Sequence, residues 1–235
     1  MVEKIKRVDG RKADELRPVK ITAGVIKEAD GSAFIEWGQN KIYAAVHGPR
    51  EVIPKHMSNP YKAILRYTYR MACFSVSERK NPRPGRRDME ISKVSAEALD
   101  KSVFLEKFPN SAIDVFVYVM DSNAGTRAAA LTAASVALAD AGIPLRGLVS
   151  SVSVGRANGN LIVDLNKEEE DVEDAVDLAL AFLPATEELV LHQSDGLHSV
   201  EEWKKMYDLG LNASKKIHEV QKQALRERYV GENNE

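Results

Sequence analysis

The stretch Asn123-Ala-Gly-Thr-Arg-Ala-Ala-Ala-Leu-Thr-Ala-Ala-Ser-Val-Ala-Leu-Ala-Asp140 is the part of this sequence that decides the fold. It predicts an α-helix that begins near Thr126 and ends at Asp140, because Gly142 and Pro144 stop helices. Its many small alanine side chains suit tight packing. A strand that looks buried, from Ile113 to Met120, comes shortly before the helix, so we expect the helix to lie against a sheet.

The residues on the N-terminal side of this helix are typical of antiparallel sheet. Two turn signals, Asp30-Gly31 and Gly38-Gln39-Asn40, divide residues 19–47 into three segments rich in Val, Ile, Ala and aromatic residues. This pattern predicts a β-meander. Residues 63–75 resemble a further strand, and apolar residues at helical spacing over 91–105 predict a helix after it.

The C-terminal half continues the alternation of strands and helices. Asn158-Gly159 is the strongest hairpin signal in the sequence, and strand-like residues 149–156 and 160–164 flank it. Residues 199–229 predict a long amphipathic helix with an interruption near Gly210. The order of elements therefore predicts an α+β fold, with mixed sheets covered by helices.

Composition limits the possible partners. The chain has 235 residues, of which 33 are Lys or Arg and 35 are Asp or Glu, so its formal net charge is −2. Total charge gives no sign of a polyanionic partner, and any nucleic-acid site must be a local basic patch. No apolar run approaches the roughly 20 residues that span a bilayer. The N-terminal residues are charged, so we expect a cytoplasmic protein without a membrane anchor.

A cation-rich segment, Glu78-Arg-Lys-Asn-Pro-Arg-Pro-Gly-Arg-Arg87, carries five cations in ten residues. Its two prolines and Gly85 disfavour a helix, so we expect a stiffened loop that presents the guanidinium groups of Arg83, Arg86 and Arg87. One guanidinium group can donate two parallel hydrogen bonds to the oxygens of a phosphate, so the segment predicts a phosphate-binding loop. A solvated surface loop is the alternative interpretation of the basic run taken alone.

The start of the Ala-rich helix has the features of an anion site. Gly125 frees backbone N–H groups to face a ligand, and the helix dipole adds partial positive charge. Thr126 adds a hydroxyl group and Arg127 a full charge. Together these residues predict a cradle for one phosphate. The alternative is a threonine that caps the helix beside an incidental arginine.

An acidic segment follows the predicted hairpin, with eight carboxylates among the fourteen residues from Asp164 to Asp177. Crowded carboxylates repel one another unless a cation compensates, and Mg²⁺ prefers such oxygen ligands. A solvated acidic loop is the alternative. An arginine loop, a phosphate cradle and a carboxylate cluster are together the ingredients of metal-assisted phosphoryl transfer.

Short motifs in one fixed order carry a family resemblance. They are Arg7-Val-Asp-Gly-Arg11, Asp14-Glu-Leu-Arg-Pro18, Gly48-Pro-Arg-Glu51, Phe74-Ser-Val-Ser-Glu-Arg-Lys80, Arg86-Arg87, Gly125-Thr-Arg127, Ala139-Asp-Ala-Gly-Ile-Pro144 and Asp164-Leu-Asn166. On these motifs the sequence resembles the RNase PH family over nearly the whole chain, and within it the archaeal exosome branch. The resemblance implies an RNase PH-type fold of two related β-α units, similar to domain 2 of ribosomal protein S5. It also implies one domain over residues 1–230, internally duplicated at about residue 120. Residues 231–235 contain no apolar residue to anchor them, so we expect a flexible tail there.

The resemblance implies an activity and an assembly. The family's archaeal exosome members are phosphorolytic 3′→5′ exoribonucleases, which degrade single-stranded RNA to nucleoside diphosphates and add RNA tails in reverse. Inorganic phosphate is the co-substrate, and Mg²⁺ or Mn²⁺ the cofactor. The active subunit alternates with an inactive RNase PH-like partner in a hexameric ring, a trimer of heterodimers, under a cap with S1 or KH domains.

Roles carried over by position give a set of expected site residues. Gly125, Thr126 and Arg127 would hold the attacking phosphate, and Arg127 would also act in catalysis. Four arginines would bind RNA: Arg66, Arg83, Arg86 and Arg87. Asp164 and a second carboxylate would bind the metal and protonate the leaving 3′ oxygen.

The second carboxylate is ambiguous. The family places it six residues beyond the first, which is Glu170 here, whereas one extra glutamate counted back from Asp177 makes it Asp171. We favour Asp171 and keep Glu170 as the alternative. Two other functions stay open: a non-catalytic ring subunit that threads RNA, and a homohexameric RNase PH that trims transfer RNA. The presence of Asp164 and of the phosphate cradle favours catalysis.

Overall fold

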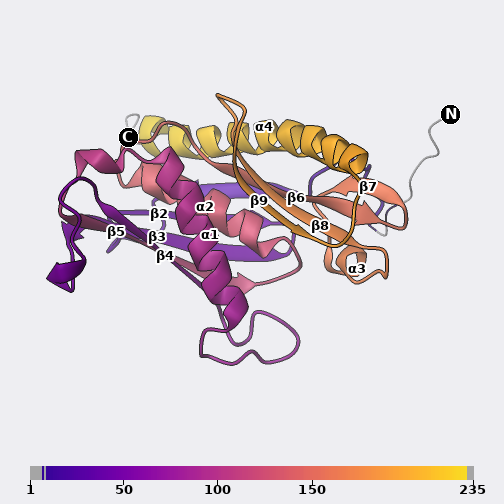
Figure 1. Cartoon of the computed structure of the whole chain (residues 1–235), viewed down its shortest axis with the longest axis horizontal. Coiled ribbons are helices and arrows are strands. Elements are labelled where there is room, and N and C mark those ends of the chain that lie inside the picture. Colours follow the sequence, from indigo (N-terminus) through magenta and orange to yellow (C-terminus); the bar gives the residue numbers. More distant parts are fainter. Residues whose placement is uncertain (1–6, 8, 232–235) are drawn as a thin grey trace.

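Two β-sheets form the framework of the molecule in the computed structural model, which describes Arg7 and residues 9–231 (Figure 1). The first sheet has five strands in the order β1-β2-β3-β5-β4, with β4 and β5 parallel and the other pairs antiparallel. Its strands are β1 (Val19–Ala23), β2 (Gly31–Trp37), β3 (Asn40–Glu51), β4 (Ile64–Met71) and β5 (Ser111–Asp121). The second sheet is antiparallel, in the order β7-β6-β8-β9. Its strands are β6 (Ser150–Ala157), β7 (Asn160–Val163), β8 (Val176–Leu183) and β9 (Glu188–Asp195).

Helices lie between and over the sheets. They are α1 (Arg86–Ser102), α2 (Thr126–Asp140), α3 (Lys167–Glu170) and α4 (Val200–Gly231), with 3₁₀ turns η1 (Lys55–Met57) and η2 (Leu105–Lys107). Helix α2 packs on strands of both sheets, and twelve of its fifteen residues are buried. A helix that is apolar on every side is stable only inside a core. Helix α2 is therefore the central element on which the two sheets meet (Figure 1).

The α+β class, the meander, the Asn158-Gly159 hairpin and the bounds of α2 are confirmed. The predicted interruption of the last helix is wrong, because α4 continues through Gly210. A Cβ atom at Gly210 would lie 2.7 Å from Leu180 Cδ1 of β8. The glycine thus lets α4 approach the second sheet closely and does not end the helix.

Strand β8 is an element that the alternation pattern does not predict. Seven of its eight residues are buried, and its sequence Val-Asp-Leu-Ala-Leu-Ala-Phe-Leu is an almost unbroken apolar run. A strand covered on both faces loses the period of two by which strands are recognised. The strand also begins inside the acidic segment. Its one carboxylate, Asp177, therefore resembles the end of a charged loop in the sequence.

The ends of the chain allow a limited comparison. Gly231, the first residue of the expected tail, is the last residue of α4, and residues 232–235 lie outside the described residues. Among the described residues, every helix is too short or too polar to cross a bilayer.

Candidate active site

A pocket of about 580 Å³ opens where α1, α2, α3, β8 and β9 come together, and we call it the α2 pocket. Its lining is rich in charged groups from segments far apart in the sequence: Arg87, Glu90, Ile91, Arg127, Lys167, Glu170, Asp171, Asp177, Gln193, Ser194 and Asp195. The pocket thus brings together one residue of the cation-rich segment, one of the predicted phosphate cradle and three carboxylates of the acidic segment.

The turn that leads into α2 has an unusual backbone. Ala124 and Gly125 have φ angles of +54° and +65°, in the left-handed region that favours glycine. Thr126 begins the helix and is buried, and its Oγ1 accepts a hydrogen bond of 2.9 Å from the Tyr69 hydroxyl. Burial is the main reason why the pKa of Tyr69 is raised, to about 12, so this donor stays protonated at neutral pH.

Arg127 and Asp177 form an ion pair inside the α2 pocket. The second oxygen of Asp177 accepts a hydrogen bond of 2.7 Å from Ser153 on β6. Sequence reasoning used Asp177 only as a reference point and missed it as a site residue. The available signals were its place at the head of an apolar run and its position six residues beyond Asp171.

Glu170 lies against the N-terminus of α2. The Gly125 N–H group, the kind of donor that was expected to hold phosphate, lies near enough to this carboxylate to favour its charged form. Burial, followed by the nearby charge of Asp177, raises the pKa of Glu170, while the Gly125 hydrogen bond and Arg87 oppose the rise. Glu170 thus lies where an anionic ligand of α2 is expected. Gly125 and Thr126 themselves are not among the residues that line the α2 pocket.

Asp171, the favoured second acid, lines the α2 pocket near its exposed side. Its carboxylate forms an ion pair of 2.5 Å with Lys167, one turn earlier, and both side chains are about 60% exposed. The structure therefore places Asp171 in the same pocket as Asp177 and Glu170.

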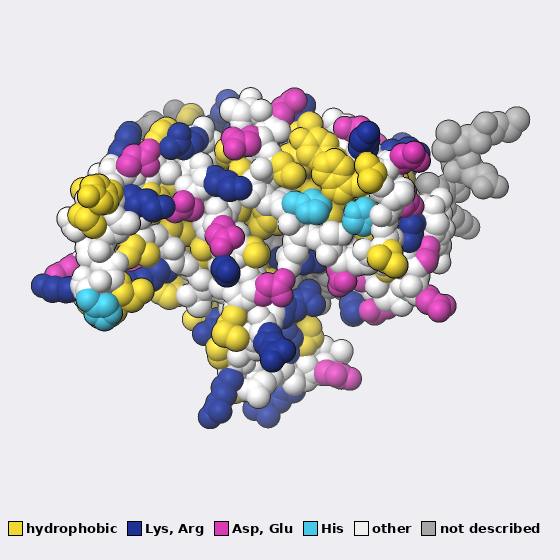
Figure 2. All heavy atoms as spheres, in the orientation of Figure 1, with side chains coloured by type: hydrophobic (Ala, Val, Ile, Leu, Met, Phe, Trp, Pro, Cys, Tyr) yellow, Lys and Arg dark blue, Asp and Glu magenta, His cyan; other side chains and the backbone are white. Residues whose placement is uncertain are grey.

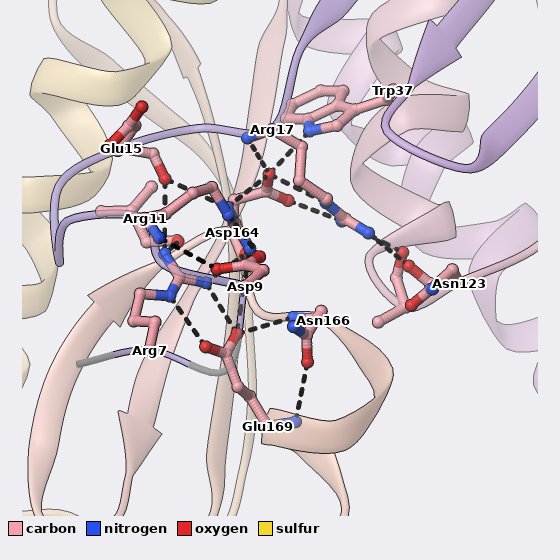
Figure 3. Close-up of polar contacts among 12 residues, drawn as sticks. Arg7, Asp9, Arg11, Glu15, Arg17, Trp37, Asn123, Asp164, Asn166 and Glu169 are labelled. Atoms are coloured by element: carbon pink, nitrogen blue, oxygen red, sulfur yellow. Dashed lines mark hydrogen bonds and ion pairs between the residues drawn. The ribbon is translucent and has the colours of Figure 1, made fainter.

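Asp164, the expected first acid, is not among the residues that line the α2 pocket. Figure 3 shows the polar side chains that surround it. It is 1% exposed, and its carboxylate accepts hydrogen bonds from Arg17, Arg11 and Trp37. These donors use both carboxylate oxygens, so the side chain is directed into a buried network and away from the pocket. The placement of Asp164 does not support the expected roles in metal binding and proton transfer.

The expected RNA-binding arginines separate into three places. Arg86 and Arg87 form the first turn of α1 and not a loop, since Asp88 caps the helix by accepting the Gly85 N–H at 2.8 Å. Of these residues only Arg87 lines the α2 pocket. Arg83 and Arg86 are exposed, and Figure 2 shows Lys and Arg side chains gathered over the loop that leads to α1.

Arg66 lies apart from the α2 pocket, on β4. It donates to the Ile53 carbonyl at 3.0 Å and approaches Asp114 at 3.8 Å. These contacts leave its guanidinium one-third exposed, so it can still face an external anion.

The carboxylates of the α2 pocket fit one mode of metal binding. Within residues 9–231 and Arg7, no three side chains of His, Cys, Asp or Glu come close enough to enclose a metal. Mg²⁺ is commonly held by one or two carboxylates together with substrate phosphates and water. Asp171 and Asp177 offer hard oxygen ligands of that kind, so the donor set fits an ion that arrives with a phosphate-bearing substrate.

Comparison with known proteins identifies the family of this chain. Two models of the 3′ exoribonuclease family match the chain, domain 1 over residues 15–144 and domain 2 over residues 147–213. Exosome complex component Rrp41 of Pyrococcus furiosus is 51% identical over 96% of this chain and 90% of its own length. The protein of the same name from Nitrosopumilus maritimus is 51% identical over 98% of this chain and 94% of its own.

Solved structures share the fold. The crystal structure of rice Rrp46 matches with a TM-score of 0.84 and 27% identity over 94% of this chain and all of the rice chain. A chain of the Archaeoglobus fulgidus exosome, solved with RNA bound to the active site, matches with a TM-score of 0.78 and 22% identity over 91% of this chain and 92% of its own. Family models, relatives and fold agree: this chain belongs to the RNase PH family of 3′ exoribonucleases.

Proposed function

We propose that this chain is a phosphorolytic 3′→5′ exoribonuclease subunit of an exosome ring, which degrades single-stranded RNA to nucleoside diphosphates and extends RNA in reverse. One observation carries the proposal. Arg87 and Arg127 line one pocket together with the carboxylates of Asp171 and Asp177, and Arg127, in the first turn of α2, is paired with Asp177. Such a pocket can hold an attacking phosphate beside the RNA phosphate that it attacks.

The positive groups account for phosphate binding. Two phosphates approach each other only where cations and N–H dipoles are already in place to offset their repulsion. Gly125, Thr126 and Arg127 supply these groups for inorganic phosphate, and Arg87 for the last RNA phosphate. Exposed Arg83 and Arg86, together with Arg66, would contact the RNA backbone outside the pocket.

The reaction transfers the terminal nucleotidyl group of the RNA to inorganic phosphate. An oxygen of inorganic phosphate bonds to the phosphorus of the terminal nucleotide, the bond from phosphorus to the 3′ oxygen breaks, and that oxygen takes a proton. The products are a nucleoside 5′-diphosphate and an RNA one nucleotide shorter. Asp171 and Asp177, with Glu170 as the alternative, would hold Mg²⁺ or Mn²⁺ and pass the proton to the leaving oxygen. When bound, the metal would neutralise charge on the phosphate oxygens.

The assembly follows from the relatives, which are named exosome complex components. We propose a hexameric ring in which this chain alternates with an inactive RNase PH-like partner, under an S1 or KH cap that assists RNA binding. A cytoplasmic location is part of the same proposal.

The test is phosphate dependence. The purified chain, alone and with its ring partner, is given single-stranded RNA and Mg²⁺ with and without inorganic phosphate. We expect nucleoside diphosphates only when phosphate is added, and RNA extension when diphosphates are in excess. Release of nucleoside monophosphates in the absence of phosphate would overturn the proposal.

A further inference from the structure

A chain segment from the N-terminal side, residues 7–17, lies between the turn before α2 and the short helix α3 (Figure 3). It carries three arginines, Arg7, Arg11 and Arg17, whose side chains are at most about 10% exposed. None of them lines the α2 pocket. Buried arginines outside a site need a structural reason, because an unpaired charge is costly to bury.

Arg17 is attached to Asp164 at three points. Its backbone N–H, Nε and Nη2 donate to the Asp164 carboxylate at 2.7, 3.0 and 2.6 Å. Trp37 Nε1 donates to the same carboxylate at 2.9 Å. The guanidinium group of Arg17 is thus fixed in position and direction by a buried acid.

The other side of the same guanidinium holds the turn before α2. Arg17 donates to the carbonyl oxygens of Asn123 and Ala124, and a Cβ atom at Gly125 would lie 3.1 Å from Arg17 Nη2. Asn40 contacts the turn as well, since its Nδ2 donates to the Ala124 carbonyl at 2.7 Å. Two consecutive residues with positive φ are held in place by these contacts, because an alanine does not favour that conformation by itself.

Arg7 makes an equivalent connection to α3. Its Nε and Nη2 donate to the Glu169 carboxylate at 2.7 and 2.6 Å, and its Nη1 donates to the Val163 carbonyl at 2.9 Å. Glu169 in turn accepts the Asn166 N–H at 2.9 Å, and Asn166 Oδ1 accepts the Glu169 N–H. Arg7 therefore fixes the first turn of α3, which leads directly to Glu170 and Asp171.

We propose that Arg17 and Arg7 are positioning residues for the two halves of the α2 pocket. Arg17, anchored on Asp164, holds the phosphate-binding turn. Arg7, anchored on Glu169, holds the short helix that leads to Glu170 and Asp171. This inference rests on the proposed function. It assigns a different effect to each arginine: Arg17 sets the affinity for inorganic phosphate, and Arg7 sets the rate of turnover.

The variants Arg17→Lys and Arg7→Lys test this division in the complete ring. A lysine keeps the charge but is a single-point donor, so it cannot span both the acid and the backbone that the arginine connects. We expect Arg17→Lys to raise the KM for phosphate about tenfold, as the loss of a hydrogen bond to a charged group predicts, with little change in kcat. Arg7→Lys should lower kcat and leave the KM for phosphate nearly unchanged.

Binding of inorganic phosphate without RNA, measured by calorimetry, gives a readout that does not depend on catalysis. Arg17→Lys should weaken it and Arg7→Lys should not. Asp164→Asn removes the anchor of Arg17, so it should weaken phosphate binding too, and its effect should not add to that of Arg17→Lys. Arg146→Lys is the control, since Arg146 pairs with Glu106 at 3.1 Å away from the α2 pocket.

Thermal unfolding of each ring separates positioning from general stability. If Arg17→Lys lowers the midpoint and the KM for phosphate stays at the wild-type value, Arg17 is only a structural residue and the inference is overturned. Equal changes of KM and kcat in both variants overturn the division of labour. A wild-type ring that shows no phosphate-dependent turnover counts against the proposed function itself, whatever the variants do.

Discussion

Arg127 of α2 and Asp177 of β8 form an ion pair in the α2 pocket, so the phosphate-binding helix and the second sheet meet at a charged contact. Ser153 holds the other oxygen of Asp177. An anion bound by Arg127 therefore lies beside a carboxylate whose direction is already fixed. In the proposed reaction, this contact brings proton transfer and phosphate binding into one pocket.

Asp177→Asn keeps the size of the side chain and the contact with Ser153 but removes its charge. We expect turnover to fall by roughly 10²-fold or more, the usual effect of losing an acid or base, while RNA affinity stays unchanged. Single-turnover degradation and RNA titration measure the two effects. Retention of near wild-type turnover would exclude Asp177 from the chemistry.

Glu170→Gln should improve phosphate binding at neutral pH. The Gly125 N–H group stabilises the charge of the nearby Glu170 carboxylate, which would compete with phosphate for this donor, and an uncharged amide competes less well. Phosphate titration should show a lower KM in the variant, and the advantage should shrink as pH falls and the native glutamate becomes protonated. The neighbouring Glu168→Gln, an exposed residue on the same helix, is the matched control. A higher KM in Glu170→Gln would mean that Glu170 helps phosphate to bind.

The same group gives a stability prediction with a defined sign. Burial and Asp177 raise the pKa of Glu170 above its usual value of 4.5, so the folded state favours the protonated form. The stability that this group contributes is present below pH 4.5 and is lost as pH rises through the raised pKa. Glu170→Gln should accordingly have a higher unfolding midpoint than the wild type at pH 7. The difference should vanish near pH 4, and a constant difference across this range would contradict the assignment.

Tyr69→Phe removes the hydrogen bond that orients Thr126 at the start of α2. The loss of one neutral hydrogen bond predicts a rise of about threefold to tenfold in the KM for phosphate. Tyr67→Phe is the control, since it removes a buried hydroxyl from the same strand and leaves the Tyr69–Thr126 bond intact. If both variants behave alike, the effect comes from packing in β4 and not from Thr126.

Arg83→Ala combined with Arg86→Ala should weaken RNA binding and make it less dependent on salt. Each lost phosphate contact lowers the slope of log affinity against log salt by about 0.7 for a single strand. Filter binding at several salt concentrations measures the slope, and the KM for phosphate should not change. Arg146→Ala is the control, because the Arg146 N–H donates to the carbonyl of Ser102, at the end of α1 opposite to Arg86. An unchanged slope would remove these two arginines from the RNA path.

The sequence predicts those parts of the fold whose signals are local. Both ends of helix α2 are predicted, because Gly142 and Pro144 stop the helix. The Asn158-Gly159 turn is by itself enough to predict the hairpin of β6 and β7. Strand β8 is not predicted, because burial on both faces removes the alternation. Arg86 and Arg87 are helical because Asp88 caps α1, and that contact outweighs the two prolines before Gly85.

The candidate site is only partly predictable for a related reason. Arg127 and the acidic segment are found by their local charge pattern, and the structure brings them together. The place of Asp164 depends on Arg17, 147 residues earlier in the chain, and no local pattern reports such a contact. From sequence alone, a carboxylate that follows a strand, such as Asp164, resembles a metal ligand. Only the structure shows that Arg17 donates hydrogen bonds to it.

The most direct test of the account follows the phosphorus atom of the attacking phosphate. The ring is incubated with single-stranded RNA, Mg²⁺ and ³²P-labelled inorganic phosphate, and the position of the label in the released nucleotides is determined. Phosphate held by α2 and Arg127 as the attacking group predicts nucleoside diphosphates labelled in the β-phosphate. Release of unlabelled nucleoside monophosphates would show that water is the attacking group and would contradict the account.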